Sequence, residues 1–385
     1  MKPALVINGL GLANRHVGQG VYAARIVEAL MRCHPDFPFC VIAPAGSEFL
    51  RRVLPASKLV ELDGRPPHHH GLISTIYWSN RIAAHASRTA PDAVFHSPTP
   101  IWARARPDHT VVTLHDCIYR HFTHYLGKRM VRRQLSRATE RYAADSETVL
   151  TDSEYSQRDL AENAGIPVKK MHVLYPWVDQ RSFDPVATAT VATLRTRLKL
   201  PGKFWLHLGG YDYRKNVEFL IAAYASVRKD VPNLTPLVLA GSIPPSGSGP
   251  LYCDVHGAIA RAGLPAEAIL LPGRIDDADL PTLFGMAALF IYPSLMEGFG
   301  LPPAEAMAMR TPVLASNASS LPEVVRLRTC RFDPRDTDEL RTRLLAAASD
   351  ESQFLCALPN EFTERFGVER YLQLLGLQSH AGAVA

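Results

Sequence analysis

The segment Ile291–Met309, IYPSLMEGFGLPPAEAMAM, places a strand pattern, a turn with two glycines and a helical pattern one after another. The apolar run ends at Tyr292, and Pro302 and Pro303 suit the first turn of a helix, where the missing proline N–H is not needed. The free backbone amides at a helix start, together with the helix dipole, favour a bound anion. We therefore expect residues 298–301 to bind a phosphate or another anionic group.

Two acidic residues flank this expected anion site. Glu297 lies in the turn, and Glu305 follows eight positions later, about one helical turn past the helix start. A carboxylate beside an anion is unfavourable unless hydroxyl groups donate hydrogen bonds to it. The pair therefore favours a ligand with sugars on both sides of a phosphate. The spacing alone fits equally well an ordinary helix start whose acidic residues interact with the helix dipole.

Outward from this segment, short apolar runs alternate with stretches of helical period along the chain. In the first half we expect strands at 4–7, 40–43, 93–96, 110–114, 148–151 and 172–174. In the second half we expect them at 204–208, 236–240, 268–271, 289–292, 312–315 and 330–332, with helices such as 21–31, 79–86, 156–164, 217–227 and 279–284 in between. This βαβ order predicts an α/β fold with two doubly wound, Rossmann-like domains.

A polar stretch with several prolines, residues 176–201, is the expected joint between the two domains. We place the first domain at 1–178 and the second at 179–360. Open α/β sheets bind ligands at the carboxyl ends of their strands. The strand-to-helix loops of the two domains are therefore expected to face each other across a cleft.

The composition supports a globular protein. The chain has 385 residues, 47% of them hydrophobic and 21% charged, which excludes disorder as its main state. No apolar run reaches the roughly 18 residues of a membrane span, and the start of the chain is too short for a signal-peptide core, so a cytoplasmic location is expected. The six cysteines lie far apart without a C-x-x-C motif, and we expect reduced, mostly buried thiols.

The net charge of +5 is unevenly distributed, because residues 1–178 hold 22 basic and 15 acidic residues. An anionic partner of this half is indicated, either a membrane surface or a phosphorylated substrate, and no nucleic acid is expected. The segment 127–142, GKRMVRRQLSRATERY, concentrates the basic residues on an expected helix: Lys128, Arg129, Arg132, Arg133, Arg137 and Arg141. Docking on anionic lipid and a solvated helix with Met130, Val131, Leu135 and Ala138 in the core both remain open.

A second strand-loop-helix segment is Leu208–Asn216, LGGYDYRKN. Arg214 and Lys215 stand at its expected helix entrance, where two cations would stabilise the charge of a departing diphosphate. In isolation an Arg-Lys pair is more often a solvated surface pair. Together with the two glutamates it favours a binding site.

Two further candidates follow strands of the first domain. Gly18 and Gly20 imitate a dinucleotide fingerprint, but about ten residues separate them from the strand end, so we reject a nicotinamide site. These glycines fit either close backbone approach to a ligand or an ordinary loop before a helix. His115 and Asp116 follow strand 110–114, where the pair could orient an imidazole toward a sugar hydroxyl, whereas His96 is expected to be scaffold.

Two possible metal motifs are interpreted as structural. Asp277-Ala278-Asp279 matches a D-x-D pattern, but it lies where first-turn acids of a helix are expected. His68-His69-His70 has no acidic companions and fits an exposed loop. No metal ligand is therefore predicted.

The combined motifs resemble those of the retaining, GT-B-fold glycosyltransferases of the E-x7-E group, similar to polysaccharide and O-antigen mannosyltransferases. Glu297 and Glu305 have the E-x7-E spacing, and Arg214-Lys215-Asn216 matches the R-K-N motif of that family. The resemblance covers nearly the whole chain and is strongest over residues 204–334. It also implies a closing helix in residues 361–377 that packs back toward the first domain.

The resemblance implies a role for each matching position. Catalysis would involve Glu297 near the anomeric carbon, Arg214 and Lys215 at the leaving diphosphate, and His115 at the donor sugar. The implied donor-binding residues, with Glu305 on the ribose and Arg274 near the base, are Gly18, Gly20, Gly210, Arg274, Gly298, Phe299, Gly300, Leu301 and Glu305. Two positions depart from the family pattern: many relatives have Arg or Thr at the place of Gly210, and Pro176-Trp177 replaces the usual Asn-Gly of the linker.

The implied function is transfer of a hexosyl unit, with mannose and GDP-mannose favoured, from a nucleoside-diphosphate sugar to a hydroxyl of a glycan or lipid-linked glycan. The implied enzymes retain the anomeric configuration and use no metal and no cofactor. A UDP-sugar-dependent transferase remains an alternative. So do a sugar-nucleotide epimerase of the same fold and a non-catalytic nucleotide-sugar-binding protein.

Overall fold

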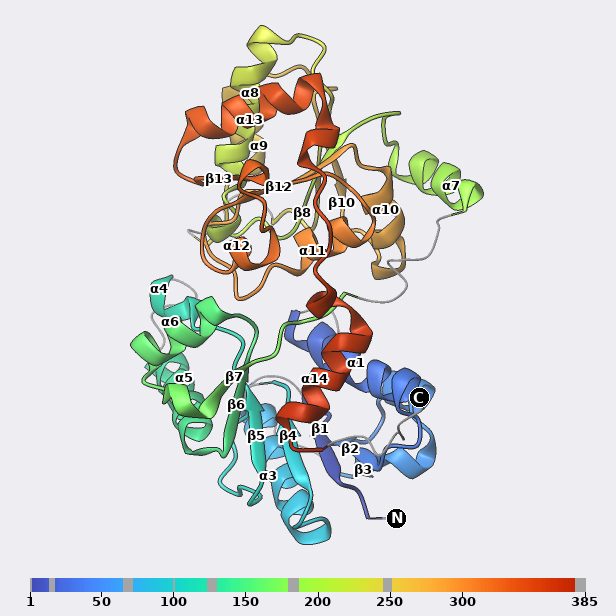
Figure 1. Cartoon of the computed structure of the whole chain (residues 1–385), viewed down its shortest axis with the longest axis vertical. Helices are drawn as coiled ribbons and strands as arrows, with labels where there is room; N and C mark the ends of the chain where they lie inside the picture. Colours follow the sequence, from blue (N-terminus) through green and yellow to red (C-terminus); the bar gives the residue numbers. More distant parts are fainter. Residues whose placement is uncertain are drawn as a thin grey trace, which may run out of the picture. The chain divides into compact units, whose positions relative to one another are not determined.

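The computed structural model describes residues 2–13, 18–64, 72–99, 101–122, 130–178, 187–244 and 251–377. The chain divides into two compact α/β units between Trp177 and Val178, and it crosses back between Thr363 and Glu364 (Figure 1). Unit 1 thus contains the chain up to Trp177 together with the C-terminal segment, and unit 2 contains Val178–Thr363. The expected boundaries at 178 and 360 differ from these by one and by three residues.

Unit 1 is built on a seven-stranded parallel sheet with the strand order β3-β2-β1-β4-β5-β6-β7. Its strands are β1 (Leu5–Asn8), β2 (Phe39–Pro44), β3 (Leu59–Leu62), β4 (Val94–Ser97), β5 (Thr110–Thr113), β6 (Thr148–Thr151) and β7 (Met171–Val173). Six of these agree with the expected strands. The seventh, β3, was not predicted, because this edge strand is only partly buried and contains the charged Glu61, which pairs with Arg51 at 2.9 Å.

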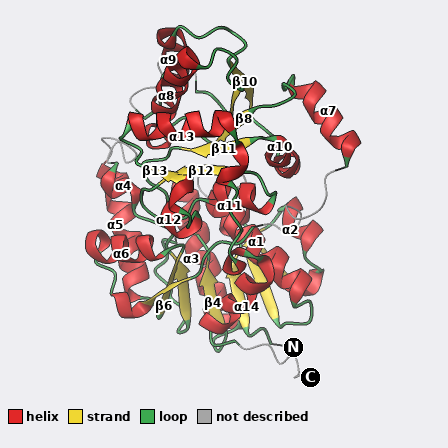
Figure 2. Cartoon of the chain, turned by 45° about the horizontal axis from the view of Figure 1, so that its top comes forward, coloured by secondary structure: helices red, strands yellow, loops and turns green. Residues whose placement is uncertain are grey.

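Helices cover both faces of this sheet (Figure 2). They are α1 (Gly18–Cys33), α2 (Glu48–Val53), α3 (Leu72–Thr89), α4 (Ile118–His121), α5 (Met130–Asp145), α6 (Glu154–Ala164) and α14 (Glu364–Leu374), with 3-10 turns at Leu10–Ala13, Ala56–Lys58 and Val168–Lys170. Leu5 and Ile7 of β1 belong to one core cluster and Val6 to another, because successive strand side chains point to opposite faces. In the described part of the chain, no helix has the length and apolar character to cross a membrane.

The end of the chain completes unit 1. Helix α14 packs against α1, and Glu364 at its start forms an ion pair with Arg32. Trp177, in the segment expected to join the domains, is buried against Gly367 of α14. A Cβ built at Gly367 would lie 2.3 Å from the Trp177 ring, so this helix must carry glycine there.

Unit 2 is built on a six-stranded parallel sheet with the order β10-β9-β8-β11-β12-β13. Its strands are β8 (Trp205–Leu208), β9 (Leu237–Ala240), β10 (Ile269–Gly273), β11 (Leu289–Tyr292), β12 (Val313–Ser316) and β13 (Arg331–Phe332), all at expected places. Its helices are α7 (Thr188–Leu198), α8 (Val217–Asp230), α9 (Val255–Ala262), α10 (Leu280–Met286), α11 (Leu301–Ala308), α12 (Leu321–Val324) and α13 (Thr337–Ser349). Short 3-10 turns lie at Tyr213–Lys215, Asp277–Asp279, Arg328–Cys330, Glu351–Phe354 and Asn360–Phe362. The prediction of two doubly wound, Rossmann-like parallel-sheet units is confirmed.

Candidate active site

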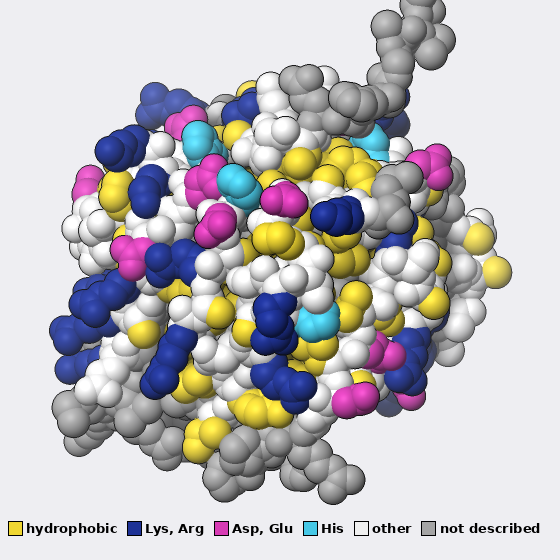
Figure 3. Space-filling model, turned by 90° about the horizontal axis from the view of Figure 1, so that it is seen from below, with side chains coloured by type: hydrophobic (Ala, Val, Ile, Leu, Met, Phe, Trp, Pro, Cys, Tyr) yellow, Lys and Arg dark blue, Asp and Glu magenta, His cyan; other side chains and the backbone are white. Residues whose placement is uncertain are grey.

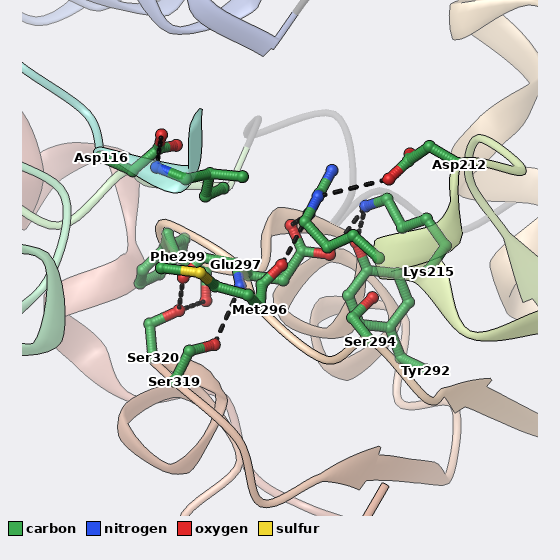
Figure 4. Close-up of polar contacts among 12 residues, drawn as sticks. Asp116, Asp212, Lys215, Tyr292, Ser294, Met296, Glu297, Phe299, Ser319 and Ser320 are labelled. Atoms are coloured by element: carbon green, nitrogen blue, oxygen red, sulfur yellow. Dashed lines mark hydrogen bonds and ion pairs between the residues drawn. The ribbon is translucent and has the colours of Figure 1, made fainter. Parts of the chain in front are cut away.

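The candidate site of unit 2 lies at the carboxyl ends of two neighbouring strands. Strands β8 and β11 pair in parallel, so the loops that follow Leu208 and Tyr292 leave the same edge of the sheet. The first loop carries Arg214 and Lys215, and the second carries Glu297 (Figure 4). Their side chains meet although more than 80 positions separate them in the sequence.

Glu297 forms ion pairs with both cations. Its Oε1 atom lies 2.8 Å from the Lys215 Nζ atom, and its Oε2 atom lies 2.5 Å from an Arg214 guanidinium nitrogen. Lys215 also donates a hydrogen bond of 2.6 Å to the Tyr292 hydroxyl, and Arg214 donates one of 2.7 Å to the Met296 carbonyl. The glutamate and the lysine are both less than 10% exposed, so these charges are held in place and poorly screened by water.

The electrostatics of this cluster follow from burial and from the two cations that face Glu297. Burial by itself would raise the pKa of Glu297, but the Arg214 and Lys215 charges outweigh it and lower the pKa to about 2. Burial lowers the pKa of Lys215, and Arg214 adds to that effect while Glu297 opposes it. Glu297 is therefore an ionised counter-charge at neutral pH.

Asn216, the last residue of the R-K-N motif, joins the two loops. Its side-chain amide donates hydrogen bonds to the carbonyls of Pro293, at 3.2 Å, and Pro334, at 2.9 Å. Its backbone adopts a φ of 57°, which asparagine tolerates better than most residues. The sequence analysis assigned no role to Asn216, and the structure shows that it positions the cations beside the Glu297 loop.

Two serines after β12 hold the Glu297 loop from the other side. Ser319 accepts a hydrogen bond of 2.9 Å from the Glu297 amide. Ser320 is fully buried, and its single hydroxyl proton lies between the carbonyls of Glu297, at 3.0 Å, and Phe299, at 2.8 Å. The sequence analysis did not single out these serines. Their place after an expected strand, at the sheet edge where the glutamate lies, was the available signal.

The expected anion-binding segment forms the start of α11. Gly300 is the N-cap at a φ of 109°, and a Cβ built there would lie 2.6 Å from a Leu321 methyl group. The residues before the helix, Gly298 and Phe299, are buried, while Leu301 opens the helix and is partly exposed. Glu305 is the fifth residue of α11 and is partly exposed. One short helix start thus carries the amides and separates the two glutamates.

Two remaining donor-binding candidates of unit 2 lie at the same sheet edge. Gly210 is exposed in the loop after β8, and a Cβ built there would meet only an Asp212 oxygen, at 3.4 Å. Packing therefore leaves room for a side chain at this position. Arg274 is exposed and directly follows Gly273, the last residue of β10.

Gly18 and Gly20 do not lie in a loop before a helix, as we expected, but in the first turn of α1. The helix begins three residues earlier than the expected 21–31, because the two glycines adopt helical backbone geometry. Gly18 is exposed with no atom within 4 Å of a Cβ built on it, and Gly20 is buried. Gly18 therefore remains accessible at the helix start.

The partner of His115 is Asp152, at the end of β6, and not the adjacent Asp116 as we expected. The His115 Nδ1 atom lies 2.8 Å from an Asp152 oxygen, and the Nε2 atom lies 3.1 Å from the Pro98 carbonyl. Asp116 instead accepts a hydrogen bond from the Ile118 amide. The parallel pairing of β5 with β6 explains this choice, since it brings the ends of both strands together. Asp152 follows an expected strand, which was the signal for it in the sequence.

Both ring nitrogens of His115 thus face acceptors. Burial would lower the pKa of this imidazole, but the Asp152 carboxylate outweighs burial and raises it. A contact with a donor sugar requires the ring to give up one of these two partners. His96 is fully buried between Tyr371 and Thr113, as expected of a scaffold residue.

The basic segment of unit 1 forms α5, on which Arg133, Arg137 and Arg141 are exposed at intervals of four residues. Lys128 and Arg129 lie outside the described residues, as does the side chain of Arg132. The buried side of the helix holds Thr139, Tyr142 and Ala143. Ala138, which the solvated-helix alternative places in the core, is exposed because it lies outside that i, i+3, i+4 stripe.

The possible metal motifs resolve in different ways. Asp277–Asp279 forms a 3-10 turn that leads into α10, with Asp279 paired to Arg197, which fits the expected role of first-turn acids. His68–His70 lie outside the described residues. The structure instead brings together Cys117, His121 and Asp159. The sequence analysis missed this group, although the C-x3-H spacing was visible.

Two family descriptions match the chain, one for each unit. Residues 195–365 match the family described as "Glycosyl transferases group 1", and residues 17–181 match "Glycosyltransferase Family 4".

Several curated proteins are similar in sequence. The chain is 29% identical over 273 residues to the O-antigen chain mannosyltransferase B of Escherichia coli, a match covering 71% of this chain and 69% of that protein. It is 35% identical over 163 residues to the serotype-specific mannosyltransferase WbdA of Escherichia coli. The second match covers 42% of this chain and 19% of WbdA, so it spans about a fifth of that relative.

Solved structures share the fold. The crystal structure of Anabaena HepE in complex with UDP and glucose has a TM-score of 0.69 at 18% identity, covering 97% of this chain and 99% of that chain. WaaG, a glycosyltransferase involved in lipopolysaccharide biosynthesis, has a TM-score of 0.62 at 15% identity, covering 97% and 96%. At these identities the similarity concerns the fold alone.

Proposed function

Because this chain is a GT-B-fold glycosyltransferase of group 1, similar to polysaccharide mannosyltransferases, we propose that it transfers a hexosyl unit from a nucleoside-diphosphate sugar to an acceptor hydroxyl with retention at the anomeric carbon. The observation that carries this proposal is the buried cluster of Arg214, Lys215 and Glu297. Glu297 pairs with both cations and Asp212 lies 3.4 Å from Arg214, so a diphosphate that replaces these carboxylates would be stabilised by both cations. A diphosphate is the ligand group that such a site favours.

The departing diphosphate is the group that needs stabilisation during transfer. As the bond from the anomeric carbon to the phosphate oxygen breaks, negative charge develops on the diphosphate, and Arg214 and Lys215 stabilise it. The acceptor oxygen forms the new bond on the same face of the sugar. Its proton passes to the leaving phosphate oxygen, so no separate base is needed.

Glu297 is better suited to a positioning role than to nucleophilic attack. Both of its oxygens are engaged by cations, and its pKa of about 2 marks a weakly basic carboxylate. It holds Arg214 and Lys215 in place until the diphosphate arrives, and it orients hydroxyls of the donor sugar. A covalent glycosyl-Glu297 intermediate is the less favoured alternative.

The start of α11 supplies the remaining donor contacts in this proposal. The amides around Gly300 bind sugar and phosphate oxygens, and Glu305, further along the helix, accepts hydrogen bonds from the ribose. The amides lie at the start of α11 and Glu305 lies within the same helix. Helical geometry therefore fixes the spacing between the phosphate and ribose contacts.

For the donor we propose GDP-mannose, because the two Escherichia coli relatives are named as mannosyltransferases. A UDP-sugar is the alternative. Thermal unfolding with GDP and with UDP separates them, since at equal concentrations the nucleotide that binds the native state more tightly raises Tm more. A larger Tm increase with GDP supports the proposal, and a larger one with UDP replaces it by the alternative.

For the acceptor we propose a glycan or a lipid-linked glycan, reached by docking of α5 on an anionic membrane surface. The exposed Arg133, Arg137 and Arg141 support this docking. On the face shown in Figure 3, several Lys and Arg side chains gather at the left edge, and elsewhere they are interspersed with acidic and hydrophobic ones. Co-sedimentation with anionic but not neutral vesicles, reduced when the three arginines are changed to Gln, is expected. Equal sedimentation with both vesicle types contradicts docking through charge.

We also propose that no metal ion takes part in the transfer, because the two cations of unit 2 supply the positive charge at the diphosphate. Turnover is then unchanged when Mg²⁺ or Mn²⁺ is added. A rate that depends on either ion contradicts this part of the proposal.

The decisive experiment measures release of nucleoside diphosphate when acceptor is added to donor and enzyme. Lys215→Ala is expected to lower kcat by about 100-fold or more, because charge on the leaving group loses a stabilising partner. Lys203→Ala is the matched control, since Lys203 is an exposed lysine of the same unit paired with Glu351. Failure to release nucleoside diphosphate with any donor supports the non-catalytic alternative, and formation of a free epimerised sugar nucleotide supports an epimerase.

A further inference from the structure

A cysteine, a histidine and an aspartate meet in unit 1, and none of the three has been assigned a role in transfer. Cys117 directly precedes α4 and His121 ends it, so the two side chains lie four positions apart on one side of a helical turn. Asp159 reaches them from α6. One ligand atom from each residue lies within 4.8 Å of the others.

We propose that this Cys117–His121–Asp159 cluster binds a zinc ion. Thiolate, imidazole and carboxylate are the three side-chain ligands that zinc uses in proteins, and three of them commonly leave a fourth position to water. Magnesium and calcium prefer sets of oxygen ligands, so this mixture of sulfur, nitrogen and oxygen does not suit them.

The distances between the ligand atoms are close to those of a zinc site, since every pair lies within 4.8 Å. Asp159 Oδ2 lies 3.1 Å from the Cys117 sulfur, and Asp159 Oδ1 lies 2.6 Å from the His121 Nε2 atom. Tetrahedral bonds of about 2.0 Å to nitrogen or oxygen and about 2.3 Å to sulfur place the ligand atoms roughly 3.3–3.6 Å apart. The His121 side chain is 36% exposed, so it can withdraw toward solvent by the difference.

The surroundings fit a site with one open face. Cys117 is fully buried and Asp159 nearly so, whereas the exposed His121 gives an ion a path from solvent and leaves room for a water ligand. Asn163, one turn further along α6, donates a hydrogen bond of 2.8 Å to Asp159 Oδ1. Such a partner orients a carboxylate ligand and is a regular feature of metal sites.

The same contacts could exist as hydrogen bonds alone, with the thiol and the imidazole both donating to Asp159. A zinc site and a hydrogen-bonded cluster differ in the state of the Cys117 sulfur. Metal binding requires the thiolate and releases the thiol proton to solvent, whereas the hydrogen-bonded cluster keeps the thiol. A signal that reports a bond between sulfur and metal therefore distinguishes them.

A bound ion would tie the loop after β5 to α6. This loop begins with Leu114 and continues through His115 and Cys117 into α4, and it contacts α6 by hydrophobic packing and by hydrogen bonds to Asp159. The ion would add a cross-link within unit 1, and all three of its ligands belong to that unit. It would hold the segment that follows His115 against α6.

Titration of the full-length, metal-stripped protein with Co²⁺ tests the proposal, because a cobalt–thiolate bond gives a charge-transfer absorption that histidine and carboxylate ligands do not. We expect this band to saturate at one equivalent, to be displaced by Zn²⁺, and to be lost in Cys117→Ser. His121→Ala changes an exposed residue that folding tolerates, and it should weaken binding by at least about tenfold.

Cys253→Ser is the matched control, because Cys253 is a partly buried thiol of unit 2 without these companions, and its band should equal that of the unaltered protein. Metal held only by the histidines at 68–70 gives no thiolate band, so it cannot be mistaken for the proposed site. Absence of the band in the unaltered protein overturns the proposal, as does its persistence in Cys117→Ser or undiminished affinity in His121→Ala. None of these readouts depends on sugar transfer.

Discussion

The imidazole of His115 and the carboxylate of Asp152 form a buried pair, with Nδ1 and Oδ2 2.8 Å apart. The second ring nitrogen faces the Pro98 carbonyl, which can only accept a hydrogen bond. Both nitrogens therefore serve as donors, and the ring is the positively charged imidazolium. The pair therefore consists of two opposite charges in the interior of unit 1.

Changing Asp152 to Asn should destabilise the protein, because a buried cation loses its counter-charge. The expected loss is about 3 kcal/mol in the free energy of unfolding, measured by urea denaturation. Asp145→Asn serves as control, since Asp145 is an exposed residue of the same unit and its ion pair with Arg106 contributes little. Equal stability of the two variants would show that His115 is neutral in the folded state.

Glu305→Gln should separate donor binding from turnover. If Glu305 accepts ribose hydroxyls, the loss of its charge raises KM for the donor by about 10- to 100-fold, since hydrogen bonds to charged groups contribute about 1.5–3 kcal/mol. The rate constant kcat should change much less. Glu267→Gln, at an exposed position of unit 2, is the control. A fall in kcat at unchanged KM contradicts this role.

Ser320→Ala should loosen the Glu297 loop, because one buried hydroxyl is bonded to two carbonyls that would lose their partner. We expect a stability loss of about 1–3 kcal/mol and a lower kcat, since Glu297 would no longer be held against the two cations. Ser226→Ala, which removes a partly buried serine hydroxyl from helix α8, is a suitable comparison. Wild-type kcat in Ser320→Ala would mean that the loop holds its geometry without this serine.

Unit 2 should lose stability as the pH falls below about 6.5. Burial lowers the pKa of His207 to about 4, so the unfolded chain binds a proton between about pH 6.5 and 4 while the native state does not. Stability is complete above that range and falls by about 3 kcal/mol through it. Glu297, whose pKa is lowered to about 2, extends the loss from about pH 4.5 downward.

The pH dependence can be measured as urea unfolding of unit 2 between pH 8 and 4, monitored by hydrogen exchange. His207→Gln should flatten the profile between pH 6.5 and 4, whereas His256→Gln, at an exposed position, should leave it unchanged. An unaltered slope in His207→Gln would assign the acid sensitivity to other groups.

Gly367→Ala should weaken the docking of α14, because the new methyl group would overlap the Trp177 ring. We expect a loss of about 1–3 kcal/mol, which is typical of overpacking in a dense core. Gly202→Ala is the control, because a Cβ at Gly202 meets no atom within 4 Å. Thermal unfolding of both variants provides the measurement.

The sequence predicted the positions of the strands more reliably than it predicted which side chains contact each other. Twelve strands could be located because buried parallel strands read as short apolar runs, whereas β3, at the sheet edge with Glu61 in it, carries no such signal. Lys215 and Glu297 could be assigned to one site because both follow strands that end at the same edge. The pairing of His115 with Asp152, and the serine supports of Glu297, depend on strand order and side-chain direction, which local patterns do not encode.

The docking of α14 also bears on how the protein is made. Val368, Tyr371, Leu372 and Leu375 complete a hydrophobic core that otherwise consists of residues from the first half of the chain. During translation, the core on this side of the sheet stays incomplete until residues 368–375 have left the ribosome. Unit 2, whose residues are contiguous, can fold completely before unit 1 does. Chaperones would therefore meet a nascent chain in which the first half is still incompletely folded.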